Sequence, residues 1–363
     1  MTRPTVSVIM ATYNHGPFVR EAVHSVLGQQ DVEFEFLISD DGSRDDTREV
    51  IASISDPRIR FTPNTVNRGA CVVTNELIRA ARGEFVALLN SDDRWSVPDK
   101  LGYQVDVLRS RPELAATYGR VRFFDRQSRT IPQESLLFGQ AFDQENRSQG
   151  RWLRRFFDEG NCLCHPTMLI RRTCYDELGA YNNRLRQLPD LDMWVRLVKR
   201  HPIHVSERPL IDFRILEGEN TSSQTPDNSI RTINEHFLIA LRLFDGVGAE
   251  AFEDGFGDTL GGRRIPSSRH LEIEKALQYF RINPWGLQRP YRMVGLQRMF
   301  ELLDDPESAA ILRSEHGIDD LWFQRMMVEV DVLRPRAVAM IDASKAEAKT
   351  MWNRLKRRVG AGG

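Results

Sequence analysis

Two adjacent carboxylates follow an apolar run in the stretch EFVALLNSDDRW, residues 84–95. Phe85–Leu89 has the composition of a buried strand, and Asn90, Asp92 and Asp93 come directly after it. Neighbouring aspartates repel each other, so a cation is expected beside them. Mg²⁺ and Mn²⁺ prefer carboxylate oxygens and usually complete their shells with water and substrate phosphates. The stretch therefore predicts a divalent metal with a diphosphate, and the plainer alternative is a solvated turn.

Polar side chains also follow three other predicted strands. Ligands of open parallel sheets sit beyond the carboxyl ends of the strands, so residues from several strand ends can meet in one site. Four strand ends with polar groups support a common binding site better than any single motif does. The residues at the other three ends are Asn14 after Val6–Met10, Asp40 and Asp41 after Phe34–Ile38, and Asn67 and Gly69 after Ile59–Phe61.

The elements that must position these residues alternate in type along the first ninety residues. Strand-like runs are separated by helical periodicity, which is typical of βαβ units. This pattern predicts an α/β protein with a mostly parallel, Rossmann-like sheet and helices on both faces. The predicted helices of this part cover residues 18–27, 46–54 and 71–81.

The pattern continues to about residue 216 and then changes. We predict a helix at 98–111, a strand at 117–125, a mobile polar loop at 127–150, a strand and a helix within 165–181, and a helix within 189–202. A polar loop at 217–229 is followed by mainly helical patterns. The sequence therefore predicts two domains, an α/β domain at 1–219 and a C-terminal α-helical domain at 220–363.

Charge and composition exclude several classes of protein. The 50 Lys and Arg nearly cancel the 51 Asp and Glu, so the net charge of −1 gives no general attraction to nucleic acid. The four cysteines are too few for a disulfide framework, and no apolar run is long enough to span a bilayer. The glycine-rich motifs GxxxxGK[ST] and GxGxxG are absent, so a metal must carry the phosphate charge. These features predict a cytoplasmic protein.

The last nineteen residues, 345–363, carry six basic side chains and one acid. Met351, Trp352 and Leu355 stand between the basic residues. An amphipathic basic helix of this kind can rest on an anionic membrane, which predicts peripheral contact with the inner face of the cell membrane. The alternatives are a solvated terminal helix and a contact between copies of the chain, so a homo-oligomer stays open.

Four stretches together resemble the family-two nucleotide-sugar glycosyltransferases of the GT-A fold. They occur in the family's order over about residues 4–215, and as a set they are highly specific. The stretches are VSVIMATYNHGPFVREAVHSVLGQQ, FEFLISDDGSRDDT, NRGACVVTNELIRAARGEFVALLNSDDRWSVPDK, and HPTMLIRR with LPDLDMWVRL. The resemblance implies a GT-A fold and inverting transfer of a sugar from a nucleoside-diphosphate sugar, with Mn²⁺ or Mg²⁺ as cofactor.

The resemblance also implies a donor site. Tyr13 would lie against the nucleobase, and Asp41 would hydrogen-bond the edge of the base. The family's DxD motif corresponds to Asn90–Asp92, and because Asn90 stands where a carboxylate is common, Asp92 or Asp93 becomes the main metal ligand. The complete set implied for the donor is Ala11, Tyr13, Asp40, Asp41, Asn67, Gly69, Asn90, Ser91, Asp92 and Arg214, with Asp92 and Asp93 for the metal.

Two further roles follow from the resemblance. Asp190 corresponds to the aspartate of the family's ED motif and would be the general base, although an aspartate after a proline is also a good helix N-cap. Asp192 is the reserve candidate for the base. Arg214 resembles the arginine of an R-x-H-x-x-N-x-S segment, in which Asn220 and Ser222 match and Leu216 replaces the histidine. This arginine would clamp the diphosphate.

The predicted function is transfer of a sugar to a glycan, a glycolipid or another hydroxyl acceptor, in the synthesis of a bacterial surface polysaccharide. Lipid-linked saccharides are candidate acceptors, and nucleic acid is not a predicted partner. Two alternatives stay open: a metal-dependent nucleotidyl or phosphoryl transfer enzyme, and an inactive nucleotide-sugar-binding module. The sequence does not identify the nucleotide base, the sugar or the linkage.

Overall fold

The computed structural model describes residues 4–330 except 217, 219, 221, 222, 224 and 283–286. Contacts divide the chain into two compact units, Met1–Pro266 and Ser267–Gly363, and each is described by itself. The domain boundary predicted after residue 219 stays a prediction. The basic segment 345–363 lies outside the described residues.

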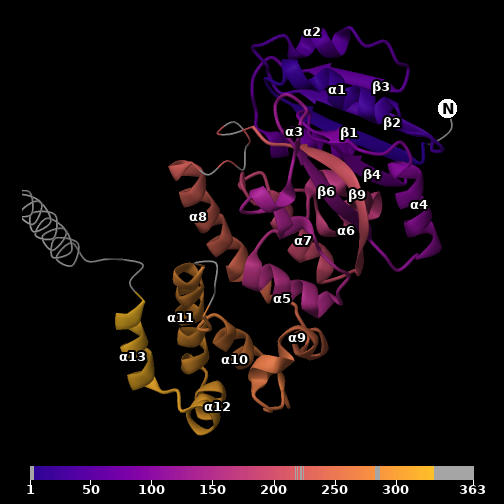
Figure 1. Cartoon of the computed structure of the whole chain (residues 1–363). Helices are drawn as coiled ribbons and strands as arrows, with labels where there is room; N and C mark the ends of the chain where they lie inside the picture. The colour runs from indigo at the N-terminus through magenta and orange to yellow at the C-terminus, as the bar shows by residue number, and fades with distance from the viewer. Residues whose placement is uncertain are drawn as a thin grey trace, which may run out of the picture. The chain divides into compact units, whose positions relative to one another are not determined.

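The first half of the large sheet is parallel. It consists of β1 (Val6–Thr12), β2 (Phe34–Asp40), β3 (Ile59–Pro63) and β4 (Phe85–Leu88), in the order β3-β2-β1-β4. The connections contain α1 (Gly16–Leu27), α2 (Thr47–Ala52) and α3 (Ala70–Ala80), which lie along this half of the sheet (Figure 1). All seven elements were expected from the alternating pattern. The first three strands extend two residues beyond the predicted ones, and β4 ends one residue earlier.

The second half of the sheet is mixed. β8 (Leu169–Arg171) pairs antiparallel with β4 and with β6 (Ala116–Phe124), and β6 runs parallel to β9 (Ile203–Arg214). Two short strands complete the sheet: β5 (Arg94–Trp95) pairs with β9, and β7 (Thr130–Ile131) pairs with β6. The predicted class, an α/β protein with a mostly parallel sheet, is confirmed.

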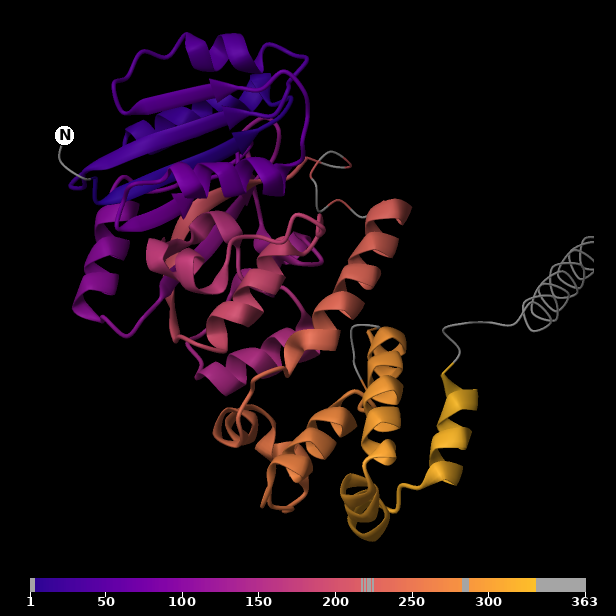
Figure 2. The same cartoon turned by 180° about the vertical axis from the view of Figure 1, so that it is seen from behind.

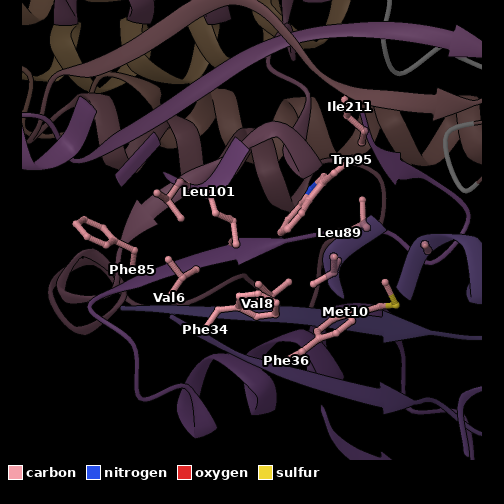
Figure 3. Close-up of a cluster of buried hydrophobic side chains, with 14 of the residues drawn as sticks. Val6, Val8, Met10, Phe34, Phe36, Phe85, Leu89, Trp95, Leu101 and Ile211 are labelled. Carbon is pink, nitrogen blue, oxygen red and sulfur yellow. The ribbon is translucent and has the colours of Figure 1, made fainter. Parts of the chain in front are cut away.

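Alternating apolar residues of the strands build the core of the first unit. Val6, Val8 and Met10 of β1 are fully buried among Phe36 and Phe85 from the neighbouring strands (Figure 3). The same cluster includes the apolar face of α1. Each fully buried side chain of this size contributes about 1.5–3 kcal/mol to the free energy of folding. The packed cluster therefore holds the strands, and with them their ends, in fixed positions relative to one another.

The remaining helices of the first unit are α4 (Lys100–Ser110), α5 (Gln149–Glu159), α6 (Arg172–Leu178), α7 (Pro189–Val198), α8 (Pro226–Leu243) and α9 (Ala249–Phe256), with short 3₁₀ turns η1 (Gln133–Ser135), η2 (Gly139–Phe142), η3 (His165–Thr167) and η4 (Gly257–Leu260). The prediction of an irregular loop at 127–150 is wrong in part, because β7, η1 and η2 lie in it. The predicted elements also do not include α5, although Trp152, Leu153 and Phe156 recur at helical spacing and are buried.

The second unit is helical over its described residues, as predicted for the C-terminal part of the chain. Its helices are α10 (Ser268–Gln278), α11 (Gln288–Asp304), α12 (Pro306–His316) and α13 (Asp320–Glu329) (Figure 2). A small core contains Ile273, Ala276, Met299, Leu312 and Ile318. Within the part of the chain that the structure describes, no helix combines the length and the apolar character needed to cross a bilayer.

Candidate active site

The register of the parallel strands brings the predicted polar residues to one edge of the sheet. Thr12, the last residue of β1, pairs with Asp40, the last residue of β2. On the other side of β1, Ile9 pairs with Leu88, so Asn90 follows at the level of Ala11. Ala11 itself is half-buried opposite Ser39. The strand ends that sequence patterns selected therefore meet in space.

Asp41 joins the end of β2 to the loop before α3. Its Oδ1 accepts the backbone N–H of Arg68 and its Oδ2 accepts that of Gly69, each at 2.8 Å. Gly69 has φ +93°, a left-handed conformation that favours glycine, and it immediately precedes the helix. Asn67, one residue before Arg68, is exposed. Asp41 thus orders the predicted Asn67–Gly69 segment around itself.

Asp40 closes the same turn from inside the protein. Its Oδ2 accepts hydrogen bonds from Arg48 Nε at 2.6 Å and from the backbone N–H of Ser43 at 3.0 Å, and the side chain is fully buried. Gly42 lies between them with φ +80°, and a Cβ there would come within 2.6 Å of the Val66 carbonyl carbon. Asp40 therefore stabilises the turn from inside, whereas Asp41 and residues 66–69 lie at the candidate site.

The turn after β1 is hydrogen-bonded to the turn after β2. The backbone N–H of Asn14 donates to Ser43 Oγ at 2.8 Å, and Asn14 Oδ1 accepts the N–H of Arg44 at 2.9 Å. Asn14 itself adopts φ +54°, which asparagine tolerates better than most residues. Tyr13, directly before it, leaves 38% of its surface exposed. An exposed aromatic ring on a fixed turn is available for stacking against a planar ligand.

The two aspartates after β4 have different surroundings. Asp93 Oδ1 accepts the backbone N–H of Arg214 at 2.8 Å, and its Oδ2 accepts Asn90 Nδ2 at 3.1 Å. Burial, together with the neighbouring charge of Asp92, raises the pKa of Asp93 well above its usual value. Asp92 accepts one hydrogen bond at Oδ2, from Asn220 Nδ2 at 3.2 Å. Of the two, Asp92 is therefore the carboxylate that is better able to bind an external cation.

The residues present fit a divalent ion only as a partial site. Among the described residues no three His, Cys, Asp or Glu side chains come together as a ligand cluster. Mg²⁺ sites in enzymes commonly use one or two carboxylates and take the remaining ligands from water and substrate phosphates. Asp92 with a bound diphosphate matches that donor set. Ser91, next to it, is buried, and its Oγ lies 2.7 Å from His15 Nδ1.

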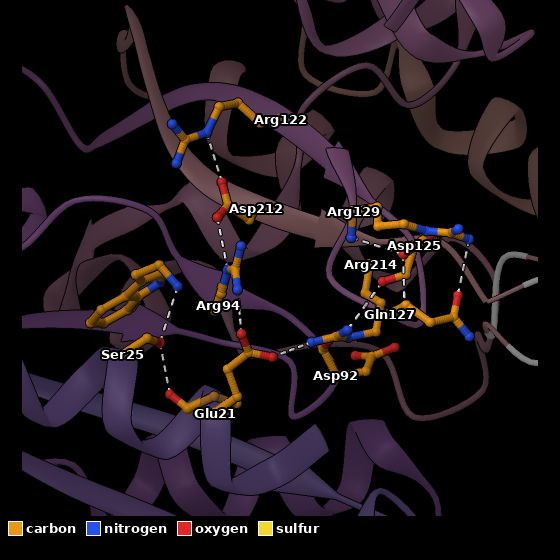
Figure 4. Close-up of polar contacts among 12 residues, drawn as sticks. Glu21, Ser25, Asp92, Arg94, Arg122, Asp125, Gln127, Arg129, Asp212 and Arg214 are labelled. Atoms are coloured by element: carbon orange, nitrogen blue, oxygen red, sulfur yellow. Dashed lines mark hydrogen bonds and ion pairs between the residues drawn. The ribbon is translucent and has the colours of Figure 1, made fainter. Parts of the chain in front are cut away.

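Arg214 points into the protein and supports the loop that carries Asp92. Its Nε donates to the backbone carbonyl of Asp92 at 2.8 Å, its Nη1 donates to that of Asp125 at 3.2 Å, and its Nη2 forms an ion pair with Glu21 (Figure 4). The guanidinium also stacks 4.1 Å from the centre of the Phe124 ring, and the side chain is only 2% exposed. In this arrangement Arg214 positions Asp92, whereas its implied contact with a diphosphate stays a prediction. Its predicted companion Ser222 lies outside the described residues.

Asp190 lies in the first turn of α7, and the N-cap position is occupied by Leu188. Its Oδ1 accepts the N–H of Leu191 at 2.8 Å, and its Oδ2 accepts Asn161 Nδ2 at 2.6 Å. Burial raises the pKa of Asp190 to about 6, and these hydrogen bonds lower it only in part. A carboxylate with this pKa can take up a proton near neutral pH. The alternative role of Asp190 as an N-cap is wrong.

Asp192 is engaged elsewhere. Its Oδ2 accepts Arg196 Nε at 3.0 Å and Nη2 at 2.9 Å, one helical turn further along α7. Arg196 also donates to the carbonyl oxygens of Leu178 and Ala180. Asp192 thus ties α7 to the end of α6, and its role as a reserve base stays a prediction that these contacts do not favour.

Helix α3 links the two sides of the site. The loop at its N-terminus is bound by Asp41, whereas Asn75 in its middle donates through Nδ2 to the carbonyl of Tyr181 at 2.7 Å. Burial raises the pKa of Cys71, at the start of α3, to about 11, and the nearby charge of Asp190 contributes to this rise. The candidate base therefore lies beside the helix that begins at the candidate nucleotide pocket.

Several residues of the site were not predicted. His15 contacts Ser91, Asn161 donates to Asp190, and Glu235 of α8 binds the loop before α7. Each lies at least 29 residues from its partner in sequence. No local spacing or periodicity signals a contact of that kind, so only the fold reveals it.

Comparisons with known proteins show the family of the chain. Residues 7–179 match the family described as Glycosyl transferase family 2. The putative teichuronic acid biosynthesis glycosyltransferase TuaG of Bacillus subtilis is 39% identical over 230 residues, which are 61% of this chain and 83% of that protein. The Escherichia coli protein WfgD, a UDP-Glc:alpha-D-GlcNAc-diphosphoundecaprenol beta-1,3-glucosyltransferase, is 33% identical over 123 residues. That match spans 34% of this chain and about half (48%) of WfgD.

A similar fold occurs in S. aureus TarS. The crystal structure of its residues 1–349 in complex with UDP-GlcNAc has a TM-score of 0.56 and 17% sequence identity, with 81% of each chain covered. At this level of identity the likeness concerns the fold.

Proposed function

This chain belongs to glycosyl transferase family 2 and is a glycosyltransferase of the GT-A fold, and from this membership we propose an inverting, metal-dependent reaction. The donor is a nucleoside-diphosphate sugar, and the acceptor is a hydroxyl group of a glycan, a glycolipid or a similar molecule. The acceptor oxygen attacks the anomeric carbon from the face opposite the diphosphate. The bond from that carbon to the diphosphate oxygen breaks, and the diphosphate leaves with the electron pair.

The observation that carries this proposal is the environment of Asp190. A hydroxyl is a poor nucleophile at neutral pH, and a base with a pKa near the working pH is best suited to remove its proton. Burial raises the pKa of Asp190 to about 6, and Asn161 fixes its Oδ2. At pH 7 the carboxylate form predominates, so Asp190 accepts the proton of the acceptor hydroxyl as the new bond forms.

The donor half of the proposal uses the strand ends. Tyr13 offers an exposed ring for the nucleobase, and Asp41 offers a carboxylate for the edge of the base. A carboxylate accepts hydrogen bonds only, which favours a base with an N–H group on that edge, as uracil has. The names of two similar proteins point the same way, since WfgD uses UDP-Glc and TarS was solved with UDP-GlcNAc. We therefore take UDP-sugars as the first donors to test.

A divalent ion, when bound, would stabilise the charge that develops on the leaving diphosphate. Asp92 is the residue that we propose to hold it, and Arg214 and Asn220 keep Asp92 in place. Asp93 contributes by fixing the backbone of Arg214. Mn²⁺ and Mg²⁺ are both compatible with an oxygen donor set of this kind.

For the acceptor we propose a saccharide of a bacterial surface polysaccharide, free or linked to a lipid. The names of TuaG and WfgD support this class, since one refers to teichuronic acid biosynthesis and the other to a diphosphoundecaprenol-linked saccharide.

A calorimetric binding panel tests the proposal. UDP-, GDP-, dTDP- and CMP-linked sugars are titrated with and without Mn²⁺ into the wild type, Asp92→Asn and the control Asp176→Asn, which removes an exposed carboxylate of α6. We expect one class of donor to bind in a metal-dependent way, and this binding to be lost only in Asp92→Asn. If no donor binds under any condition, the proposal fails. If a donor binds but incubation with Mn²⁺ releases no free nucleotide from it, the inactive binding module is favoured instead.

A further inference from the structure

Glu235 of helix α8 binds the backbone directly before the helix that carries Asp190. Its Oε1 accepts the N–H of Arg186 at 2.8 Å, and its Oε2 accepts the N–H groups of Gln187 at 2.8 Å and Leu188 at 2.7 Å. The side chain is buried, with 4% of the residue exposed. One carboxylate thus collects three successive backbone amides from a segment distant in sequence.

Of these three amides, that of Leu188 belongs to the N-cap residue of α7, and those of Arg186 and Gln187 directly precede it. The first N–H groups of a helix have no partner among its own carbonyls, and the N-cap residue Leu188 offers no capping side chain. Asp190 Oδ1 accepts one of these groups, the N–H of Leu191. Pro189 follows Leu188 and has no N–H to offer. The carboxylate of Glu235 therefore binds the N-cap amide and the two amides before it from another helix, with charge-assisted hydrogen bonds at the positive end of the helix dipole. Asp190 is the next residue after Pro189.

α8 also supports the second group that holds Asp190. His236, next to Glu235, packs so closely on Gly160 that a Cβ there would lie 2.9 Å from its Cε1. Gly160 precedes Asn161, whose Nδ2 donates to Asp190 Oδ2 at 2.6 Å. Figure 2 shows α8 beside the part of the first unit that contains α7. Adjacent residues of one helix thus contact both segments that fix the candidate base.

We propose that Glu235 is a positioning residue for the general base Asp190, which it acts on through the Arg186–Leu188 backbone and through its charge. This inference rests on the proposed function, in which Asp190 removes the acceptor proton. It adds a part from α8, which lies outside the residues 7–179 that match the family. Without the carboxylate, the segment that leads into α7 loses three hydrogen bonds, and the start of the helix that carries Asp190 is held less firmly relative to the acceptor.

The charge of Glu235 gives this role a distinct signature. A negative neighbour disfavours the ionised form of Asp190, and Glu235 accordingly raises the pKa of Asp190. The other titratable groups that interact with Asp190 are Cys71 of α3, Tyr118 of β6, Cys164 before η3 and Tyr181 before α7, and burial raises the pKa of each. These four groups are neutral near pH 7. Among the groups named here, Glu235 is therefore the one whose charge acts on Asp190 at that pH.

The test compares Glu235→Gln, Glu235→Asp and the control Asp227→Asn, which removes a carboxylate from the exposed first turn of the same helix. Release of UDP from UDP-glucose and UDP-N-acetylglucosamine, with Mn²⁺ and with water as acceptor, gives kcat and KM as a function of pH. Asp190→Asn is measured beside them. Calorimetric binding of the same UDP-sugars reports whether each variant keeps the donor site.

We expect kcat of Glu235→Gln to fall by about 10- to 100-fold, because a small misplacement of a catalytic group has an effect of that size. Donor affinity should stay within about 3-fold of the wild type, since only the base is displaced. The acid limb of the kcat profile should move to lower pH, because a negative neighbour is lost. Glu235→Asp keeps the charge but is one methylene shorter, so it should lose kcat without moving the limb. A purely structural role would not produce this difference.

Two results would overturn the inference while leaving the proposed function intact: Glu235→Gln matching Asp227→Asn in kcat, or an acid limb that does not move, in each case with Asp190→Asn inactive. If Asp190→Asn turns over like the wild type, the proposed base itself is wrong. Amide hydrogen exchange of the wild type provides a readout that depends neither on turnover nor on the folding of a variant. The amides of Arg186–Leu188 should be protected by about 100-fold or more, and exchange at the rate of an open loop would also reject the role of Glu235.

Discussion

Asn161 Nδ2 lies 2.6 Å from Asp190 Oδ2, so the candidate base is held by an amide from a different segment of the chain. This hydrogen bond favours the ionised carboxylate and lowers the pKa of Asp190, whereas burial and the charge of Glu235 raise it. The resulting pKa of about 6 is a balance between these effects. Loss of the Asn161 hydrogen bond should raise the pKa of Asp190, and loss of the Glu235 charge should lower it.

The first prediction concerns Asn161→Ala. Loss of the hydrogen bond removes support for the ionised form, so the pKa of Asp190 should rise and the acid limb of the kcat profile should move to higher pH. The matched control is Asn182→Ala, because Asn182 Oδ1 accepts the backbone N–H of Arg184 rather than a group of Asp190. A limb that moves to lower pH, or stays in place, would contradict the assignment of Asp190 as the titrating base.

The second prediction concerns the stability of Asp190→Asn. The folded-state pKa of about 6 lies above the usual 3.8, so the native state binds the proton more tightly than the unfolded state. Wild-type stability from this group is therefore fully present below about pH 4 and is lost as pH rises through 6. The amide introduced by Asp190→Asn does not ionise, so the variant should gain stability relative to wild type between pH 4 and 7. The gain is at most about 3 kcal/mol, because the pKa rises from 3.8 to about 6 and each pKa unit corresponds to about 1.4 kcal/mol.

Thermal unfolding at several pH values measures this difference. Turnover should fall by at least about 100-fold in the same variant, because general-base catalysis contributes that much or more, while donor binding persists. A variant that is less stable than the wild type at pH 7 would show that the carboxylate stabilises the fold and is not strained by burial.

The third prediction separates Asp92 from Asp93. The pKa of Asp93 is raised well above its usual value, and both of its oxygens accept hydrogen bonds within the protein. Asp93→Asn should therefore keep metal-dependent donor binding within about 3-fold of the wild type, whereas Asp92→Asn should lose it. Calorimetry with and without Mn²⁺ distinguishes the two variants. Equal losses in both would mean that the two carboxylates share the metal.

The fourth prediction tests what Arg214 does. As a buried support for the Asp92 loop, Arg214 should not tolerate lysine, which lacks the planar fork that reaches Glu21 and the carbonyl of Asp125. Arg214→Lys should lower the free energy of unfolding by about 2–3 kcal/mol and weaken donor binding at the same time. If donor binding weakens while stability is unchanged, Arg214 contacts the diphosphate directly, as the family resemblance implies.

The fifth prediction concerns the basic segment 345–363. If it binds anionic lipid, the full chain should float with vesicles that contain phosphatidylglycerol and should do so less at high salt, because exposed charges are then screened. The matched comparison is the chain without these residues. Equal recovery of both in the unbound fraction rejects the membrane contact.

Sequence patterns predicted the donor side of the site better than the base side. The residues after β1, β2 and β4 stand at strand ends, and strand ends can be recognised from apolar runs of four to seven residues. The surroundings of Asp190 could not be predicted in this way. Asn161 follows α5, which packs against α7, and Glu235 of α8 binds the backbone directly before α7. No periodicity encodes which side chain binds a segment so distant in sequence.

The contacts of the Arg214 side chain could also be predicted only with the fold in hand. Its position at the end of β9 is evident from the sequence, but β5 returns along β9 and places Asp92 and Asp93 directly beside the arginine. A two-residue strand such as β5 gives no signal in a sequence. This one short pairing gives Arg214 a supporting contact with the Asp92 loop that the sequence does not indicate, and the clamp stays a prediction.

The order of the strands has an evolutionary consequence. Apart from Arg214, the side chains proposed for the nucleotide and its metal come from the first 93 residues and from one half of the sheet, whereas Asp190 and the side chains that support it come from residues 161–235. The two groups are joined where Arg214 and Asn220 bind Asp92 and where Asn75 of α3 binds Tyr181, and substitutions away from these contacts can change one group without the other. Gene duplication followed by substitutions in residues 161–235 would produce enzymes that keep the same nucleotide donor and use new acceptors.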